Sequence, residues 1–327
     1  MCPAPLSIGK IRSLQQCSSG YGTFTCLALD HRQNLRRALN PEQPSSVSDA
    51  DLTRFKLEVT GALANLATAV LLDPEYSAAQ AVAEGVLPGG TGLVVALEST
   101  GYSGAPTARE SRILPGWSPA LTRRMGASMA KLLVYYHPEA STASAVESLV
   151  GQVAEQCRAQ DLGLMLETLS YSIEPDRKLS SEEKRRVVIE TARRLTPLGV
   201  DLLKTEFPLD SREDPDEANW LEACQELSEG CRGPWILLSA AVDFETYLRQ
   251  AAVACQAGAS GVAVGRAVWQ EAVEQNSAAR AKFLKEVARP RLQQLASLCE
   301  DIARPWTEFY TRAEIPTAWF KAYGGAG

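Results

Sequence analysis

Residues 23–30 have the sequence TFTCLALD, an almost wholly apolar run that ends in Asp30. Seven similar runs follow it along the chain. They are ATAVLLD (67–73), GLVVALE (92–98), AKLLVYY (130–136), LGLMLETL (162–169), GVDLLKTE (199–206), PWILLSA (234–240) and GASGVAVG (258–265). Most of these runs are too apolar for strands with one face in water, so they indicate parallel strands that are covered on both faces.

Amphipathic stretches separate most of the runs. Residues 49–67 form one such stretch. Ser48, just before it, and Asp51, at its third position, have the spacing of a helix capping box. The 236 residues from Asp30 to Arg266 divide into seven steps of about 34 residues, the size of a βα unit. The sequence therefore predicts an α/β protein with a (β/α)8 barrel. An open doubly wound sheet is the alternative, although the first turn, DHRQNL, has no GxGxxG motif.

The length of 327 residues would allow two domains, but one barrel accounts for it. We expect a single domain over residues 1–327. Within the first 22 residues, an amphipathic helix over 7–19 is expected to plug the barrel bottom. Residues 300–327 are expected to form an aromatic, helical tail that docks on the barrel or on another subunit. The aromatic side chains in this tail favour a homo-oligomer.

Composition excludes several classes of protein. The 33 basic and 39 acidic residues give a net charge of −6, which argues against a nucleic-acid partner. No apolar run approaches the ~18 residues of a membrane span, and the first ten residues do not resemble a signal peptide. The eight cysteines and two histidines lack zinc-site spacing, so we expect no metal, reduced thiols and a cytoplasmic protein.

The residues that perform chemistry in such barrels follow the carboxyl ends of the strands. Those ends carry Asp30, Asp73, Glu98, Glu167, Lys204, Glu206, Ser239, Gly265 and Arg266. We expect Asp30 and Asp73, at the ends of the first two strands, to hold sugar hydroxyls. Helix N-caps are the alternative for these two aspartates.

Two lysines lie on predicted strands, although lysine is rarely buried. Lys131 on the fourth strand and Lys204 on the sixth can meet inside the barrel. A neutral amine next to another cation can attack a carbonyl and form a Schiff base. Glu167 ends the strand between them and suits general acid–base work. The alternatives are ion pairs of the lysines with Glu167 or Glu206, and a counter-ion role for Glu167.

The last two strand ends predict a phosphate site. Ser239 supplies a hydroxyl, Gly265 allows close approach, and Arg266 offers a bidentate cation after the eighth strand. An ordinary arginine at a helix start is the alternative for Arg266. The first loop carries a basic cluster, which either meets a second anion or forms a solvated helix face. This cluster comprises His31, Arg32, Arg36 and Arg37.

Ten segments together resemble the class I tagatose 1,6-bisphosphate aldolases. They are LALDHR, FKLEVTGALA, VLLDPEYS, ESTGYSG, LPGWS, KLLVYYHP, LETLSY, DLLKTEFPLD, PWILLSAAV and GASGVAVGRAVW. A sister group, the sulfofructosephosphate aldolases, is similar mainly over the last third of the chain. The resemblance implies a metal-free barrel enzyme that cleaves a ketose phosphate into dihydroxyacetone phosphate and an aldehyde.

By this resemblance the Schiff-base lysine is Lys204 and the catalytic carboxylate is Glu167. The second barrel lysine is Lys131, and the aspartate after the first strand is Asp30. The phosphate of the dihydroxyacetone half is expected to rest on Ser239, Gly265 and Arg266. We expect Lys131 to keep Lys204 neutral and to order the substrate hydroxyls.

The chain departs from the family pattern at two places. Histidine at position 31 replaces the usual glutamine, and Ala240-Ala241 replaces a serine–glycine or alanine–glycine step. Both changes lie near loops that are expected to bind anions. They therefore leave open which group the distal end of the substrate carries.

Three other functions remain open at this point. One is a sulfosugar-phosphate aldolase, which would hold a sulfonate near Arg32 and release sulfolactaldehyde. Another is a catalytically silent regulator that binds a sugar phosphate. A third is an isomerase that uses Glu167 as its base.

Overall fold

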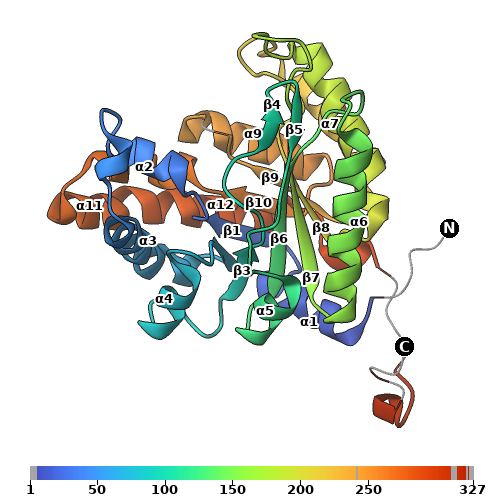
Figure 1. The fold of residues 1–327 in the computed structure, drawn as a ribbon, viewed down its shortest axis with the longest axis horizontal. Helices are drawn as coiled ribbons and strands as arrows, with labels where there is room; N and C mark the ends of the chain where they lie inside the picture. The colour runs from blue at the N-terminus through green and yellow to red at the C-terminus, as the bar shows by residue number, and fades with distance from the viewer. Residues whose placement is uncertain (1–5, 241, 311–314, 322, 324–327) are drawn as a thin grey trace.

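Eight parallel strands close into a barrel in the computed structural model, which describes residues 6–240, 242–310, 315–321 and 323 (Figure 1). The strands are β1 (Phe24–Ala28), β2 (Ala69–Leu72), β3 (Gly92–Ala96), β6 (Met129–Tyr135), β7 (Gly163–Leu169), β8 (Leu202–Thr205), β9 (Trp235–Leu238) and β10 (Gly261–Val264). Seven of the predicted apolar runs contain one strand each, and the run 130–136 overlaps β6, which begins one residue earlier. β10 pairs with β1 to complete the circle. The predicted (β/α)8 barrel is therefore confirmed, and the open sheet is wrong.

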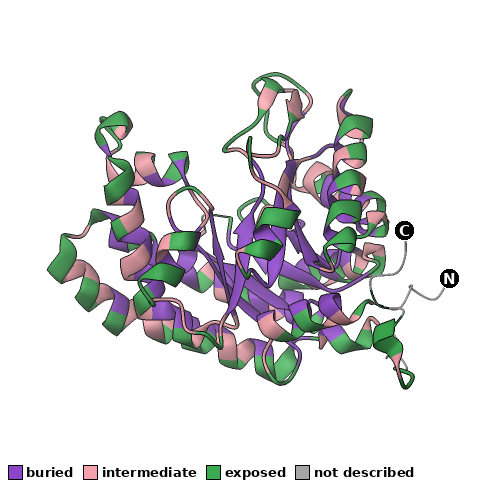
Figure 2. Cartoon of the chain, turned by 60° about the horizontal axis from the view of Figure 1, so that its bottom comes forward, coloured by how far each residue is buried: buried purple, intermediate pink, exposed green. Residues whose placement is uncertain are grey.

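Helices form the outer layer around the buried strands (Figure 2). They are α2 (Gln33–Leu39), α3 (Asp49–Leu63), α4 (Ala78–Ala83), α5 (Pro119–Arg124), α6 (Ala143–Ala159), α7 (Ser181–Leu195), α8 (Glu217–Gly230), α9 (Phe244–Gln256), α10 (Arg266–Trp269), α11 (Ser277–Phe283) and α12 (Arg289–Ile302). The predicted capping box before α3 is present, because Ser48 and Asp51 each accept a hydrogen bond from the other's backbone N–H. Among the described helices, none combines the length and the apolar character that a membrane crossing requires.

The inside of the barrel is apolar at its amino-terminal end. Alternate residues of the strands face inward, and they form a buried cluster that includes Cys26, Met129 and Met165. The seven cysteines within the described residues are free thiols, six of them buried. This apolar layer supports the polar layer above it.

Helix α1 (Ile8–Cys17) closes the amino-terminal end of the barrel, as the predicted plug would. Its Leu14 and Cys17 belong to the interior cluster. The backbone N–H of Gly163, at the start of β7, donates to Ser13 Oγ over 3.1 Å. Lys10 forms a buried ion pair of 2.8 Å with Asp201, before β8. These contacts join the plug to two neighbouring strands.

The segment after α12 docks on the same end of the barrel. The indole N–H of Trp306 donates to Ser18 Oγ over 3.1 Å, and the hydroxyl of Tyr310 donates to the carbonyl oxygen of Asp201 over 2.9 Å. The prediction of a helical tail over 300–327 is wrong for the described part, because α12 ends at Ile302 and only 3₁₀ turns follow. Residues 311–314, 322 and 324–327 lie outside the described residues. The homo-oligomer stays a prediction.

A hairpin that the sequence did not predict interrupts the βα rhythm between β3 and β6. Its strands are β4 (Ser103–Ala105) and β5 (Ala108–Glu110). The guanidinium of Arg109 lies 4.5–5.3 Å from the ring centroids of Tyr102, Tyr135 and Tyr171. Cation–π contacts of this kind attach the hairpin to the ends of β6 and β7.

Candidate active site

Strand alternation aims the predicted catalytic side chains into the barrel. Lys131 stands two residues after inward-facing Met129, and Glu167 stands two residues after Met165. Glu167 is the register partner of Lys204 on the neighbouring strand. The charged groups therefore form a layer directly above the apolar one.

Lys131 lies at the centre of three carboxylates and is completely buried. Its Nζ is 2.6 Å from Glu98 Oε1, 2.7 Å from Asp30 Oδ2 and 2.9 Å from Glu167 Oε2. Burial alone would lower the pKa of Lys131, but the three negative charges outweigh it and raise that pKa well above its ordinary value. Lys131 is therefore a permanent cation at neutral pH. The three carboxylates stabilise the positive charge of its ammonium group.

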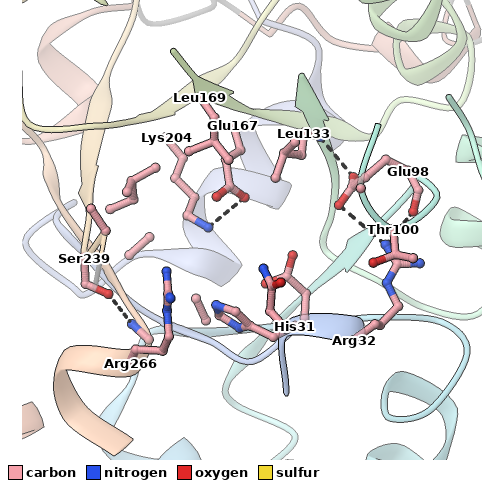
Figure 3. Close-up of a pocket in the computed structure, with 18 of the residues that line it drawn as sticks. His31, Arg32, Glu98, Thr100, Leu133, Glu167, Leu169, Lys204, Ser239 and Arg266 are labelled. Atoms are coloured by element: carbon pink, nitrogen blue, oxygen red, sulfur yellow. Dashed lines mark hydrogen bonds and ion pairs between the residues drawn. The ribbon is translucent and has the colours of Figure 1, made fainter. Parts of the chain in front are cut away.

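Lys204 is also buried but differs from Lys131 in its position and its partners. Its side chain lines a cavity of about 160 Å³ at the carboxyl ends of the strands, whereas Lys131 does not reach that cavity. Lys204 Nζ lies 2.8 Å from Glu167 Oε2, its single carboxylate partner within 4.0 Å among the described residues (Figure 3). Lys204 is thus the barrel lysine that a ligand can touch.

Glu167 connects the two lysines through one oxygen atom. Burial raises the pKa of Glu167, but the Lys131 and Lys204 charges overcome this effect and lower the pKa below its ordinary value. The same balance, with Lys131 again the strongest attraction, lowers the pKa of Asp30. Both carboxylates are therefore ionised at neutral pH. The described residues hold no group of three or more His, Cys, Asp and Glu side chains arranged for a metal ion.

Ser239, Gly265 and Arg266, the residues expected to hold a phosphate, line one side of the cavity. The backbone N–H of Gly265 donates to Ser239 Oγ over 3.1 Å and fixes the two loops to each other. A Cβ atom at Gly265 would lie 3.0 Å from the carbonyl oxygen of Ala28, so glycine permits this close approach. Arg266 forms no ion pair within 4.0 Å among the described residues, and the charge of Glu167 acts on it from farther away.

His31 also lines the cavity, between the two predicted anion sites (Figure 3). Its ring packs edge-on against Trp269, with the centroids 5.3 Å apart, and its buried Nδ1 has no hydrogen-bond partner among the described residues. Burial lowers the pKa of His31 to about 4, so the imidazole is neutral at physiological pH.

Arg32 lines the opposite side of the cavity and is already paired. One guanidinium nitrogen lies 2.5 Å from Glu75 Oε2, and the other donates to the carbonyl oxygen of Glu98 over 2.6 Å. In the same basic cluster, Arg36 pairs with Asp49 outside the cavity, and Arg37 is an exposed helix residue. The cluster is therefore divided between the cavity wall and the helix surface.

Asp73 corrects the prediction that it would hold sugar hydroxyls. Its side chain is fully buried in an ion pair with Lys56 of α3, and it does not line the cavity. It also accepts hydrogen bonds from the backbone N–H groups of Glu75 and Tyr76, over 3.0 and 2.8 Å. The physical reason is that the chain turns directly after β2, and the aspartate satisfies the turn.

Two carboxylates contribute to the site without having been assigned a role from the sequence. Glu98 follows β3 at the inward-facing spacing and contacts Lys131, a signal that the strand-end pattern already contained. Glu75 reaches Arg32 from the turn after β2, and no periodicity indicated that contact. Glu206, an alternative partner for the lysines, instead accepts hydrogen bonds from Ser170.

Sequence comparison relates the chain to known aldolases. The sequence model of a family described as DeoC/LacD family aldolase matches residues 24–271. The chain is 28% identical over 325 residues to a tagatose 1,6-diphosphate aldolase of Streptococcus agalactiae, covering 91% of this chain and 98% of the relative. It is 29% identical over 321 residues to the enzyme of the same name from Lactococcus lactis, with the same coverage.

Solved structures share the fold at lower sequence identity. An archaeal fructose 1,6-bisphosphate aldolase superposes with a TM-score of 0.60 at 19% identity, covering 88% of this chain and 98% of that one. A Schiff-base-forming fructose-1,6-bisphosphate aldolase superposes with a TM-score of 0.59, at the same identity and coverage.

Proposed function

Because the chain belongs to the DeoC/LacD family of aldolases, we propose that it cleaves a ketose phosphate through a Schiff base on Lys204. The observation that carries this proposal is the difference between the two barrel lysines. Lys131 is enclosed by three carboxylates, whereas Lys204 lines the cavity. A nucleophile must reach the carbonyl carbon that it attacks.

In the proposed reaction, Lys204 gives its ammonium proton to Glu167, and the resulting neutral amine adds to the C2 carbonyl of the ketose. The resulting carbinolamine loses water and becomes an iminium ion. Glu167 lies 2.8 Å from Lys204 Nζ and is held ionised by Lys131, so it is placed to move protons in these steps. Asp30, also ionised, completes the negative charge around Lys131.

Cleavage follows from the same groups. Glu167 takes the proton of the C4 hydroxyl while the C3–C4 bond breaks, and the electron pair of that bond moves into the iminium to give an enamine. The aldehyde leaves, and Glu167 returns the proton, which the enamine takes up at C3. Water then hydrolyses the iminium, which releases dihydroxyacetone phosphate and regenerates the amine of Lys204. The phosphate of this half would rest on Ser239, Gly265 and Arg266, with neutral His31 beside it.

Borohydride trapping tests the proposal. Treatment with dihydroxyacetone phosphate and borohydride should add one reduced adduct, which peptide mass spectrometry should locate on Lys204. The Lys204→Arg variant, which keeps the charge but is a poor nucleophile, should give no adduct. An adduct on another lysine, or none in the native chain, would overturn the assignment. The curated relatives make tagatose 1,6-bisphosphate the first ketose to try.

Two other outcomes would point to different functions. Binding of sugar phosphates without cleavage of any of them would favour a regulator. Proton exchange on a bound ketose without carbon–carbon cleavage would favour an isomerase with Glu167 as its base. The position of Lys204 in the cavity wall supports the aldolase over both.

A further inference from the structure

The two arginines that line the cavity differ in whether a carboxylate of the protein already pairs with them. Arg266, on the side of Ser239, has no carboxylate within 4.0 Å in the described part of the chain, whereas Arg32 has two. Figure 3 shows them on opposite sides of the cavity, with His31 between them. Of these two arginines, Arg266 is the one without a carboxylate partner among the described residues, so it is the one free to pair with an incoming anion.

Arg32 is held from two directions. Its guanidinium lies 2.5 Å from Glu75 Oε2 and 3.8 Å from Glu98 Oε1, and its side chain is only 5% exposed. The turn after β2 fixes Glu75, because Asp73 accepts a hydrogen bond from the Glu75 backbone N–H. Asp73 is fixed in turn by its buried ion pair with Lys56. The pairing of Arg32 is thus built into the fold.

The charges around Arg32 leave no surplus for a second phosphate. Lys131, the buried cation that shares Glu98 with Arg32, is already surrounded by Asp30, Glu98 and Glu167. A second phosphate beside Arg32 would meet the carboxylates of Asp30 and Glu98. The guanidinium of Arg109, which stacks on Tyr135, does not line the cavity. Like charges at such close range disfavour binding and serve to reject wrong partners.

Uncharged polar groups also line the cavity, and one of them, Thr100, lies beside Arg32 (Figure 3). Asn34, Ser99, Thr100 and Tyr135 supply amide and hydroxyl groups. Hydroxyl groups both donate and accept hydrogen bonds, so these side chains suit a hydroxylated ligand.

We infer that the distal half of the substrate is hydroxylated and uncharged, so that the chain acts on ketose 1-phosphates in preference to 1,6-bisphosphates. The inference rests on the proposed aldolase function and narrows its substrate class. The chemistry of cleavage is unchanged: the products are dihydroxyacetone phosphate and a hydroxyaldehyde that carries no phosphate. It also argues against a distal sulfonate on Arg32.

The condensation reaction tests the inference with a matched pair of aldehydes. Dihydroxyacetone phosphate is supplied with racemic glyceraldehyde or with racemic glyceraldehyde 3-phosphate, which differ only in the distal phosphate. We expect kcat/KM to favour glyceraldehyde by at least about tenfold. Equal or greater kcat/KM with glyceraldehyde 3-phosphate would overturn the inference, as would trapping on Lys204 without condensation of either aldehyde. Failure of trapping itself would overturn the proposed function instead.

A variant of the positioning residue Glu75 provides the second measurement. Glu75→Gln keeps a hydrogen-bond acceptor for Arg32 but removes one of its two matching charges, so the preference for glyceraldehyde should fall by at least about threefold. Glu110→Gln, an exposed carboxylate on β5, is the matched control and should leave the preference unchanged. A folded Glu75→Gln variant with the native preference would show that Arg32 does not select the substrate.

Discussion

Replacement of Lys131 by methionine would leave three buried carboxylates without the cation that joins them. Removal of one partner from a buried ion pair costs about 3–5 kcal/mol, because the remaining charge stays buried and uncompensated. Lys131 is completely buried, so solvent screening does not reduce this effect. We therefore expect Lys131→Met to lose about 3–5 kcal/mol in the free energy of unfolding at neutral pH. Urea denaturation measures this loss directly.

The pH dependence of that loss tests the physical cause. The native pKa values of Glu167 and Asp30 are lowered, so their contribution to stability is present above their unfolded values and is lost as the pH falls through the native ones. The raised pKa of Lys131 keeps its contribution present throughout this acidic range. In the variant, protonation of a carboxylate relieves the repulsion. The stability difference between variant and native chain should therefore shrink as the pH is lowered.

The same substitution should move the catalytic pH profile. Without Lys131 the pKa of Glu167 rises, so the acidic limb of kcat/KM shifts to higher pH. Lys10→Met is the matched control, because it breaks another buried ion pair, with Asp201, at the far end of the barrel. The control should lose comparable stability and keep the native acidic limb. A Lys131→Met variant that loses less than about 1 kcal/mol, or keeps the native limb, would refute this electrostatic explanation.

Three further changes have distinct expected outcomes. Glu167→Gln should lower kcat by about 10²–10⁴ in steady-state assays of cleavage, because it removes the proposed base, and native turnover would contradict that role. Gly261→Ala should cost at least about 2 kcal/mol in urea denaturation, because the residue has a φ of +139° and its added Cβ would lie 1.9 Å from the Phe24 carbonyl oxygen. Gly151→Ala, in α6 with open space around it, should instead add about 0.5–1 kcal/mol, and equal effects of the two glycine substitutions would show that local geometry does not decide them.

The strands and the charged layer could be predicted from the sequence because both follow from short-range periodicity. An apolar run with a charged residue at its end indicates a buried strand and its catalytic edge, and alternation places Lys131 and Glu167 on the inner face. The hairpin around Arg109 escaped prediction because its strands have three residues each and little apolar character.

The failure at Asp73 has a different cause. Asp30 and Asp73 both end an apolar run, but one faces the cavity and the other closes a turn against Lys56 of α3. Lys56 lies 17 positions away in the sequence, so this choice depends on helix packing that no local pattern contains. The pairing of Arg32 with Glu75, across 43 positions, was hidden for the same reason.

The closure of one barrel end by α1 and Trp306 has a kinetic consequence. In the described part of the chain this end is filled by apolar side chains, so the ketose, both products and the water that hydrolyses the iminium share the opposite opening. Under the proposed mechanism, the departing aldehyde vacates the space next to the covalently held half. Because all these molecules share one opening, the aldehyde must leave before water can enter. Dihydroxyacetone phosphate stays covalently bound until that water hydrolyses the iminium, so it leaves last.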